Sequence, residues 1–101
     1  MKLQIESNEK TLTGILSGRL DTAASTQFAK DMEPLVQNAD KKIILDCSGL
    51  EFISSSGLRL FLTIRKASIA HGGEVILRHV SSDIKQVFTI TGFVSLFKFE
   101  D

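Results

Sequence analysis

One stretch near the middle of the chain constrains the fold most, because a strand pattern, a polar turn and a helix pattern follow one another there. Four of the six residues 42–47 are apolar and they do not alternate with polar ones, which is typical of a strand in a sheet buried on both faces. Three consecutive serines at positions 54–56 come next, and a strongly apolar run then predicts a helix over residues 56–70. The stretch therefore favours an α/β fold with parallel strands.

The serines stand where a helix N-cap is expected. A hydroxyl just before an apolar helical run accepts a hydrogen bond from a free N–H group of the first turn. Only one of the three serines can be the cap. The other two, followed by Gly57, indicate a surface where small polar groups are recognised or modified.

The remaining patterns complete a single domain of residues 1–101. Residues 2–7 and 11–17 alternate as strands and predict an antiparallel hairpin. Strands and helices then alternate, which predicts right-handed crossovers between parallel strands. The predicted fold is an α/β domain with a mixed, mostly parallel sheet of four to five strands, the N-terminal hairpin and about three helices. The later predicted elements are a helix over 22–36 that Pro34 kinks or breaks, a strand over 74–80, a helix over 84–91 and a short edge strand within 94–99.

Composition excludes several classes of function. The chain has 12 Lys and Arg residues against 12 Asp and Glu residues, so it lacks the basic excess of a general nucleic-acid binder. No apolar run reaches the roughly 20 residues that a membrane-spanning helix needs. The single cysteine, Cys47, is predicted to be an inert buried thiol. These features predict a cytoplasmic protein with no direct nucleic-acid or membrane contact.

Polar side chains follow several of the predicted strands. Asp21 follows the second strand, where it can also cap the next helix, Ser48 and the serines follow the third, and His79 lies near the end of the fourth. The carboxyl ends of parallel strands share one edge of a sheet, and ligands usually bind there. The topology therefore predicts that these groups converge.

The central stretch also resembles a known family signature. Its run from Asp46 to Leu58 reads Asp-x-Ser-x-Leu-x-x-Ile-x-Ser-Ser-Gly-Leu and is similar to the signature of STAS-domain anti-sigma factor antagonists. In that family the hydroxyl residue immediately before the Gly-Leu pair, here Ser56, is phosphorylated by a partner serine kinase. The family usually has an aspartate where this chain has Ser54. A matching Gly-x-Leu-Asp run implies that Asp21 lies beside the phosphoacceptor.

The resemblance implies a binding protein rather than an enzyme. The unphosphorylated domain would bind an anti-sigma factor serine kinase and free the sigma factor, phosphorylation would end that binding, and a metal-dependent serine phosphatase would restore it. The chain itself would need no cofactor and no metal, and would be a monomer or a weak dimer. The residues expected to contact the partner are Asp21, Ser54, Ser55, Gly57, Leu58 and Arg59, with some apolar residues of the first two helical turns also exposed for this purpose.

Two other functions fit parts of the pattern. The domain could be an accessory subunit that docks constitutively on a lipid-transport ATPase, in which case Ser56 would only cap the helix. It could also be a hydrolase with Ser56, His79 and Asp21 as a triad, although the serine lacks the G-x-S-x-G context of a nucleophile elbow.

Overall fold

The N-terminal alternation produces the predicted hairpin. In the computed structural model, which describes residues 1–100, strand β1 (Lys2–Ser7) pairs antiparallel with β2 (Thr11–Leu20). The Asn8 side chain accepts hydrogen bonds from the backbone N–H groups of Lys10 and Thr11, at 3.0 and 2.8 Å, and so closes the turn.

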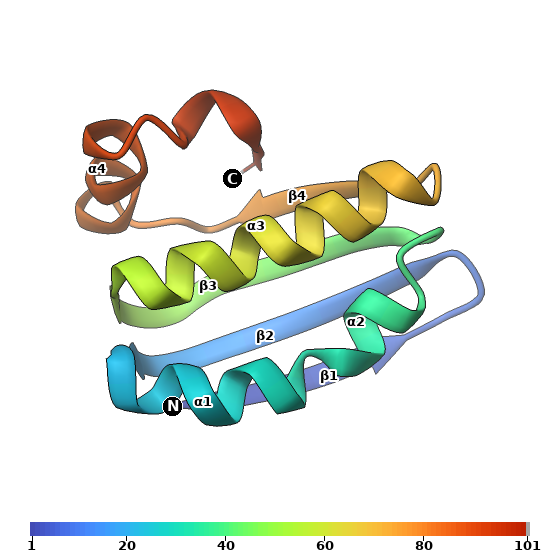
Figure 1. Ribbon diagram of the computed structural model, residues 1–101, viewed down its shortest axis with the longest axis horizontal. Coiled ribbons are helices and arrows are strands. Elements are labelled where there is room, and N and C mark those ends of the chain that lie inside the picture. Colours follow the sequence, from blue (N-terminus) through green and yellow to red (C-terminus); the bar gives the residue numbers. More distant parts are fainter. Residues whose placement is uncertain (101) are drawn as a thin grey trace.

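The strands form one sheet in the order β1-β2-β3-β4-β5, and every pair after the hairpin is parallel. Helices connect the parallel strands, as the alternation of patterns predicted (Figure 1). The elements after the hairpin are α1 (Thr22–Asp31), α2 (Glu33–Gln37), β3 (Lys42–Ile53), α3 (Ser55–Ala70), β4 (Glu74–Arg78), α4 (Ser82–Ile90), the short 3-10 helix η1 (Val94–Leu96) and β5 (Lys98–Glu100). The predicted fold class is confirmed.

Pro34 breaks the first helical region, as predicted. Helix α1 ends at Asp31, and Pro34 lies in the first turn of the separate helix α2. Proline is tolerated at that position because the N–H group it lacks would have no partner inside the helix. The break explains why the structure has four α-helices where about three were predicted.

Strand β3 extends beyond its apolar segment. The sequence predicted a strand that ends at Cys47, but β3 continues to Ile53 and pairs with β2 along that extension. Polar residues such as Ser48 and Glu51 made this part resemble a loop. They are tolerated because β4 stops pairing at Asp46, so the extension has a strand neighbour on one side only.

All helices lie on the same face of the sheet (Figure 1). No helix therefore covers the opposite face, although the predicted burial of the apolar part of β3 on both faces is confirmed. Ile43 and Leu45 join the core beneath the helices, whereas Ile44, between them, lies on the opposite face and pairs with Ile76 of β4. Both isoleucines are still buried, at 7% and 1% exposure, although no helix covers them. Long charged side chains flank them in the neighbouring rows, and the stems of such side chains can cover apolar surface.

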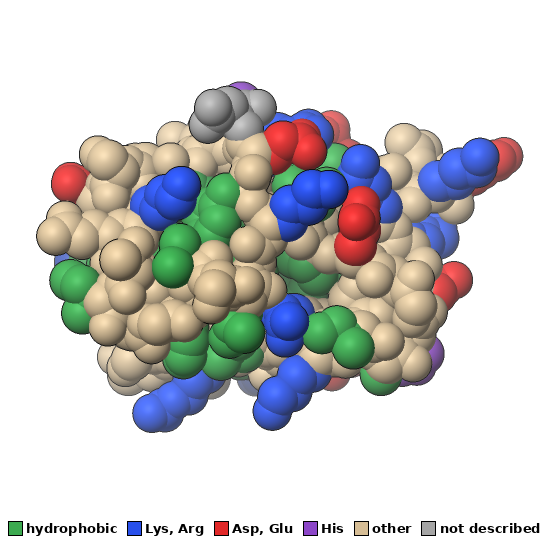
Figure 2. Space-filling view, turned by 90° about the horizontal axis from the view of Figure 1, so that it is seen from above, with side chains coloured by type: hydrophobic (Ala, Val, Ile, Leu, Met, Phe, Trp, Pro, Cys, Tyr) green, Lys and Arg blue, Asp and Glu red, His purple; other side chains and the backbone are tan. Residues whose placement is uncertain are grey.

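The C-terminal segment differs in part from its prediction. Residues 94–99 were expected to be a short edge strand, but η1 occupies the first three and β5 begins only at Lys98. An ion pair between Arg78 and Glu100, at 2.6 Å, links β5 to β4. The Arg78 side chain lowers the pKa of Glu100, mainly by its hydrogen bond to that carboxylate. On the face of the molecule that Figure 2 shows, hydrophobic side chains occur in small groups among Lys and Arg side chains.

The core beneath the helices is centred on aromatic rings. Phe61 of α3 is fully buried and packs against Phe28, Phe88 and Phe97, with ring centroids 6.1, 6.1 and 6.5 Å away. Cys47 is buried as predicted, and this burial raises the pKa of its thiol to about 12. Within residues 1–100, no helix is long and apolar enough to cross a membrane.

Candidate functional site

The serine triplet forms the start of α3, and each serine has a different position in it. Ser54 is the N-cap: its backbone is extended, and its hydroxyl oxygen accepts a hydrogen bond from the backbone N–H of Gly57 at 3.2 Å. Ser55 and Ser56 are the first two residues of the helix. The prediction that one serine caps the helix is confirmed, and the other two hydroxyls remain available.

Gly57 lets this turn approach the sheet closely. A β-carbon at this position would lie 2.8 Å from Cγ and Cδ2 of Leu20 and 3.1 Å from Cγ1 of Ile53. Neighbours this close leave no room for a side chain unless the packing shifts. Glycine therefore places the first turn of α3 directly against the end of β2.

Asp21 lies beside the serines, as predicted. The backbone N–H of Ser54 donates to the carbonyl of Leu20 at 2.8 Å, so the two chain segments are neighbours where β2 and β3 end. Asp21 also caps α1, because its Oδ1 accepts from the backbone N–H of Ala24 at 2.8 Å. Its position as a cap and its position beside the serines are thus compatible.

Ser55 and Ser56 differ in accessibility. Ser55 is exposed, whereas Ser56 is half-buried. Neither hydroxyl makes a hydrogen bond within residues 1–100. Ser56 lines an open hollow of about 350 Å³ between α1 and α3, and its other lining residues are Thr22, Ser25, Thr26, Arg59 and Leu60. The surface next to the serines is therefore rich in hydroxyl groups and carries one exposed cation, Arg59.

The sequence did not single out the hydroxyl residues of α1. Thr22 and Thr26 lie four positions apart and so share a face of that helix, which the structure turns toward α3. The signal that could have revealed them was their position just after Asp21, at the sheet edge already predicted to hold the site.

His79 and Ser48 do not reach this site, contrary to the predicted convergence. Strand β4 ends with Arg78 opposite Asp46, seven residues before the end of β3, so His79 lies roughly 20 Å from the serines along the sheet. Ser48 is inside β3 rather than after it. The Ser56, His79 and Asp21 triad is therefore not assembled.

Two of the residues expected to contact a partner lie below the surface. Gly57 is buried and Leu58 is 1% exposed, because both face the core. The apolar residues of the first two turns are mostly buried in the same way, and only Leu60 and Leu62 are half-buried. The accessible part of the predicted surface consists of Asp21, the serines and Arg59.

The N-cap assignment gives a direct prediction. Ser54→Ala removes the acceptor for the Gly57 N–H and should lower the free energy of unfolding by about 1 kcal/mol. Ser55→Ala is the matched control, since Ser55 is exposed, and should change stability by less than about 0.5 kcal/mol. Denaturant unfolding of both variants measures the difference. Equal stabilities of the two variants would contradict the assignment of Ser54 as the cap.

Known proteins resemble this chain over nearly its whole length. The family model described as the STAS domain matches residues 2–101. BtrV of Bordetella bronchiseptica, which is named an anti-sigma factor antagonist on a provisional basis, is 31% identical over 97 residues, covering 96% of this chain and 84% of BtrV.

Two solved structures extend the similarity to three dimensions. The anti-sigma factor antagonist SpoIIAA in its unphosphorylated form has a TM-score of 0.81 and 27% identity, covering 99% of this chain and 89% of that one. The phosphorylated form of the Bacillus cell fate determinant SpoIIAA has a TM-score of 0.73 and 25% identity, covering 99% and 92%. With a family model that spans nearly its whole length, this chain belongs to the STAS domain family.

Proposed function

We propose that this protein is an anti-sigma factor antagonist that acts in the cytoplasm as a binding protein and is switched off by phosphorylation at the start of α3. The observation that carries the proposal is the serine triplet at the N-terminus of α3, which has two free hydroxyls and begins beside the end of β2. Anti-sigma factor antagonists among its relatives support the binding function. The two solved forms of SpoIIAA, unphosphorylated and phosphorylated, support the switch.

The acceptor in this proposal is one of two serines. The family resemblance implies Ser56, and the accessibility of the hydroxyls favours Ser55, because a kinase needs an exposed oxygen and Ser55 is the more exposed of the two. Ser54 is the least suitable, since its oxygen already accepts the Gly57 N–H. The position of the phosphoryl group therefore has to be measured separately from its presence.

The electrostatics of the site suit a switch that changes the surface and not the fold. A phosphoryl group brings roughly −1.5 to −2 charges at pH 7. The N-terminus of a helix favours negative charge by about 0.3–1 kcal/mol. Arg59, one turn into α3, partly offsets the added charge, whereas Asp21 repels it. We therefore expect the modified domain to remain folded while the surface offered to a partner becomes strongly negative.

The partner in this proposal is an anti-sigma factor with serine kinase activity, and a metal-dependent serine phosphatase reverses the modification. ATP would belong to the kinase. In the unmodified state the kinase would contact Asp21, Ser55 and Arg59, which are accessible, and Gly57 and Leu58 would support that surface from below.

The test combines mass measurement with partner capture. The protein is purified from its own cells under several growth conditions, and its intact mass is measured, with fragmentation to localise any phosphoryl group. In parallel, tagged wild type and the variants Ser55→Ala, Ser55→Glu, Ser56→Ala and Ser56→Glu are purified with their bound partners. We expect a phosphoryl group on Ser55 or Ser56. We also expect the glutamate at that position, but not the alanine, to reduce kinase capture at least tenfold.

A different result would point to a different function. If no phosphoryl group is found and both glutamate variants still retain their partner, the switch is wrong. Capture of a transporter ATPase that is indifferent to all four substitutions would favour the alternative of constitutive docking on a lipid-transport machine.

A further inference from the structure

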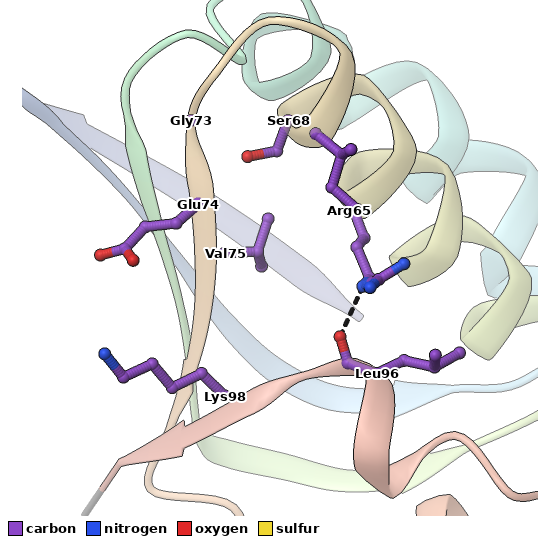
Figure 3. A pocket seen from close by; sticks show the side chains of 8 residues that line it. Arg65, Ser68, Gly73, Glu74, Val75, Leu96 and Lys98 are labelled. Carbon is purple, nitrogen blue, oxygen red and sulfur yellow. Dashed lines mark hydrogen bonds between the residues drawn. The ribbon is translucent and has the colours of Figure 1, made fainter.

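A second hollow lies at the far end of α3, twelve residues or about 18 Å along the helix from Ser56. It is a cavity of about 190 Å³ between α3, the start of β4 and the segment where η1 leads into β5 (Figure 3). This is smaller than the ~300–1,000 Å³ of a typical drug-sized site. The hollow is separate from the serine site and can hold only a small molecule.

Ser68 gives this hollow a polar group without a partner. The residue is 1% exposed, and its hydroxyl makes no hydrogen bond within residues 1–100. The hydroxyl oxygen points toward the start of β4 at Gly73 (Figure 3). A buried hydroxyl without a partner is unfavourable, because it has lost its hydrogen bonds to water and gained none in the protein. Such groups are rare in native proteins, and a bound molecule that accepts from the hydroxyl would satisfy this one.

Arg65 supplies a cation at the same hollow. Its Nε donates to the backbone carbonyl of Leu96, which fixes the guanidinium between α3 and η1 (Figure 3). Guanidinium has five N–H donors, so the terminal nitrogens remain available for a planar oxyanion. In the described part of the chain, no carboxylate lies within ion-pair distance of Arg65. Glu74 and Lys98 extend to the other side of β4 (Figure 3).

Besides Gly73, Glu74 and Lys98, the remaining lining residues are aliphatic. Val75 forms the floor on β4 and is almost fully buried. Ile69 and Leu96 stand at the rim, where they are unusually exposed for large apolar side chains, at 59% and 37%. A ligand with an apolar body would cover both and remove their surface from water.

We propose that this hollow binds a small aliphatic carboxylate. The carboxylate would accept hydrogen bonds from the terminal nitrogens of Arg65 and from the hydroxyl of Ser68. The hydrocarbon part would lie against Val75, Ile69 and Leu96. This assignment accounts for the unpaired cation, the unpartnered hydroxyl and the exposed apolar rim with a single ligand.

The test is an NMR titration of the ¹⁵N-labelled protein with pentanoate, and pentanamide serves as the neutral control of the same shape. Pentanoate should give saturable shifts confined to amides of residues 65–75 and 94–98, and pentanamide should bind at least tenfold more weakly. Arg65→Met keeps most of the apolar stem but removes the charge, and it should weaken pentanoate binding at least about tenfold. Ser68→Ala should weaken pentanoate binding several-fold. Without ligand, the amide spectrum of this variant should still be that of a folded protein.

Several results would overturn the proposal. These are the absence of saturable shifts at tens of millimolar pentanoate, equal binding of pentanoate and pentanamide, and unchanged binding in both variants. If Arg65→Met does not fold, the comparison of pentanoate with pentanamide on the wild type still decides the matter. None of these outcomes depends on the proposed phosphorylation switch.

Discussion

Gly73→Ala should be among the most destabilising single substitutions in this protein. A β-carbon at position 73 would lie 2.1 Å from the carbonyl oxygen of Ala39 and 2.7 Å from that of Lys41. Both neighbours are backbone atoms, so they cannot move aside as a flexible side chain can. We expect the free energy of unfolding to fall by about 3 kcal/mol or more, the upper end of what overpacking costs. The melting temperature should fall by on the order of 10–20 °C.

The neighbouring glycine offers a matched control. A β-carbon on Gly72 would meet nothing within 4 Å, but the residue has a φ of +78°, which L side chains rarely adopt. Gly72→Ala should therefore cost only about 1 kcal/mol, through backbone strain alone. Thermal and denaturant unfolding of both variants measures the contrast. If Gly72→Ala proves as damaging as Gly73→Ala, close packing against the loop before β3 is not the reason for glycine at position 73.

Local patterns were sufficient for most of the fold. Alternation predicted the hairpin, the break at Pro34 followed from its missing N–H group, and the serines marked the start of α3. The errors arose where pairing between strands, and not the local sequence, determines the secondary structure. The polar second half of β3 is a strand because it pairs with β2, and no pattern within residues 48–53 shows that a partner strand extends this far. In the same way, Ile44 is apolar although no helix covers its face of the sheet.

Only part of the candidate site was predicted, again because pairing between strands determines where each strand ends. Asp21 and the serines are each adjacent to a strand end, and the two strands end at the same level. His79 was expected nearby because strand order was foreseeable but strand length was not. The mismatch between the short β4 and the long β3 separates His79 from the serines. The hollow at Arg65 and Ser68 could not be predicted, because it depends on how η1 folds back against α3.

Phe61→Ala should have the second large effect. Phe61 is fully buried, and its ring neighbours come from three other segments: Phe28 from α1, Phe88 from α4 and Phe97 from the residues before β5. Removing the ring loses its transfer free energy and leaves a cavity that these rigid neighbours cannot fill. The expected loss is about 3–5 kcal/mol, a large share of the roughly 5–15 kcal/mol that stabilises a small domain. Denaturant unfolding followed by circular dichroism measures it.

Phe52→Ala separates the effect of position from that of residue type. The Phe52 ring is 38% exposed at the end of β3, and the Arg19 guanidinium lies 4.5 Å from its centroid. An exposed contact of this kind contributes about 0.5–1 kcal/mol, so this variant should lose little more than that.

Because Phe61 joins α3 to α1, its removal should also loosen the surface between the two helices where Ser56 faces Thr22 and Thr26. Hydrogen exchange in the first turns of α1 and α3 should then rise in Phe61→Ala and not in Phe52→Ala. Equal losses of stability in the two variants would show that the aromatic cluster is not the centre of the core.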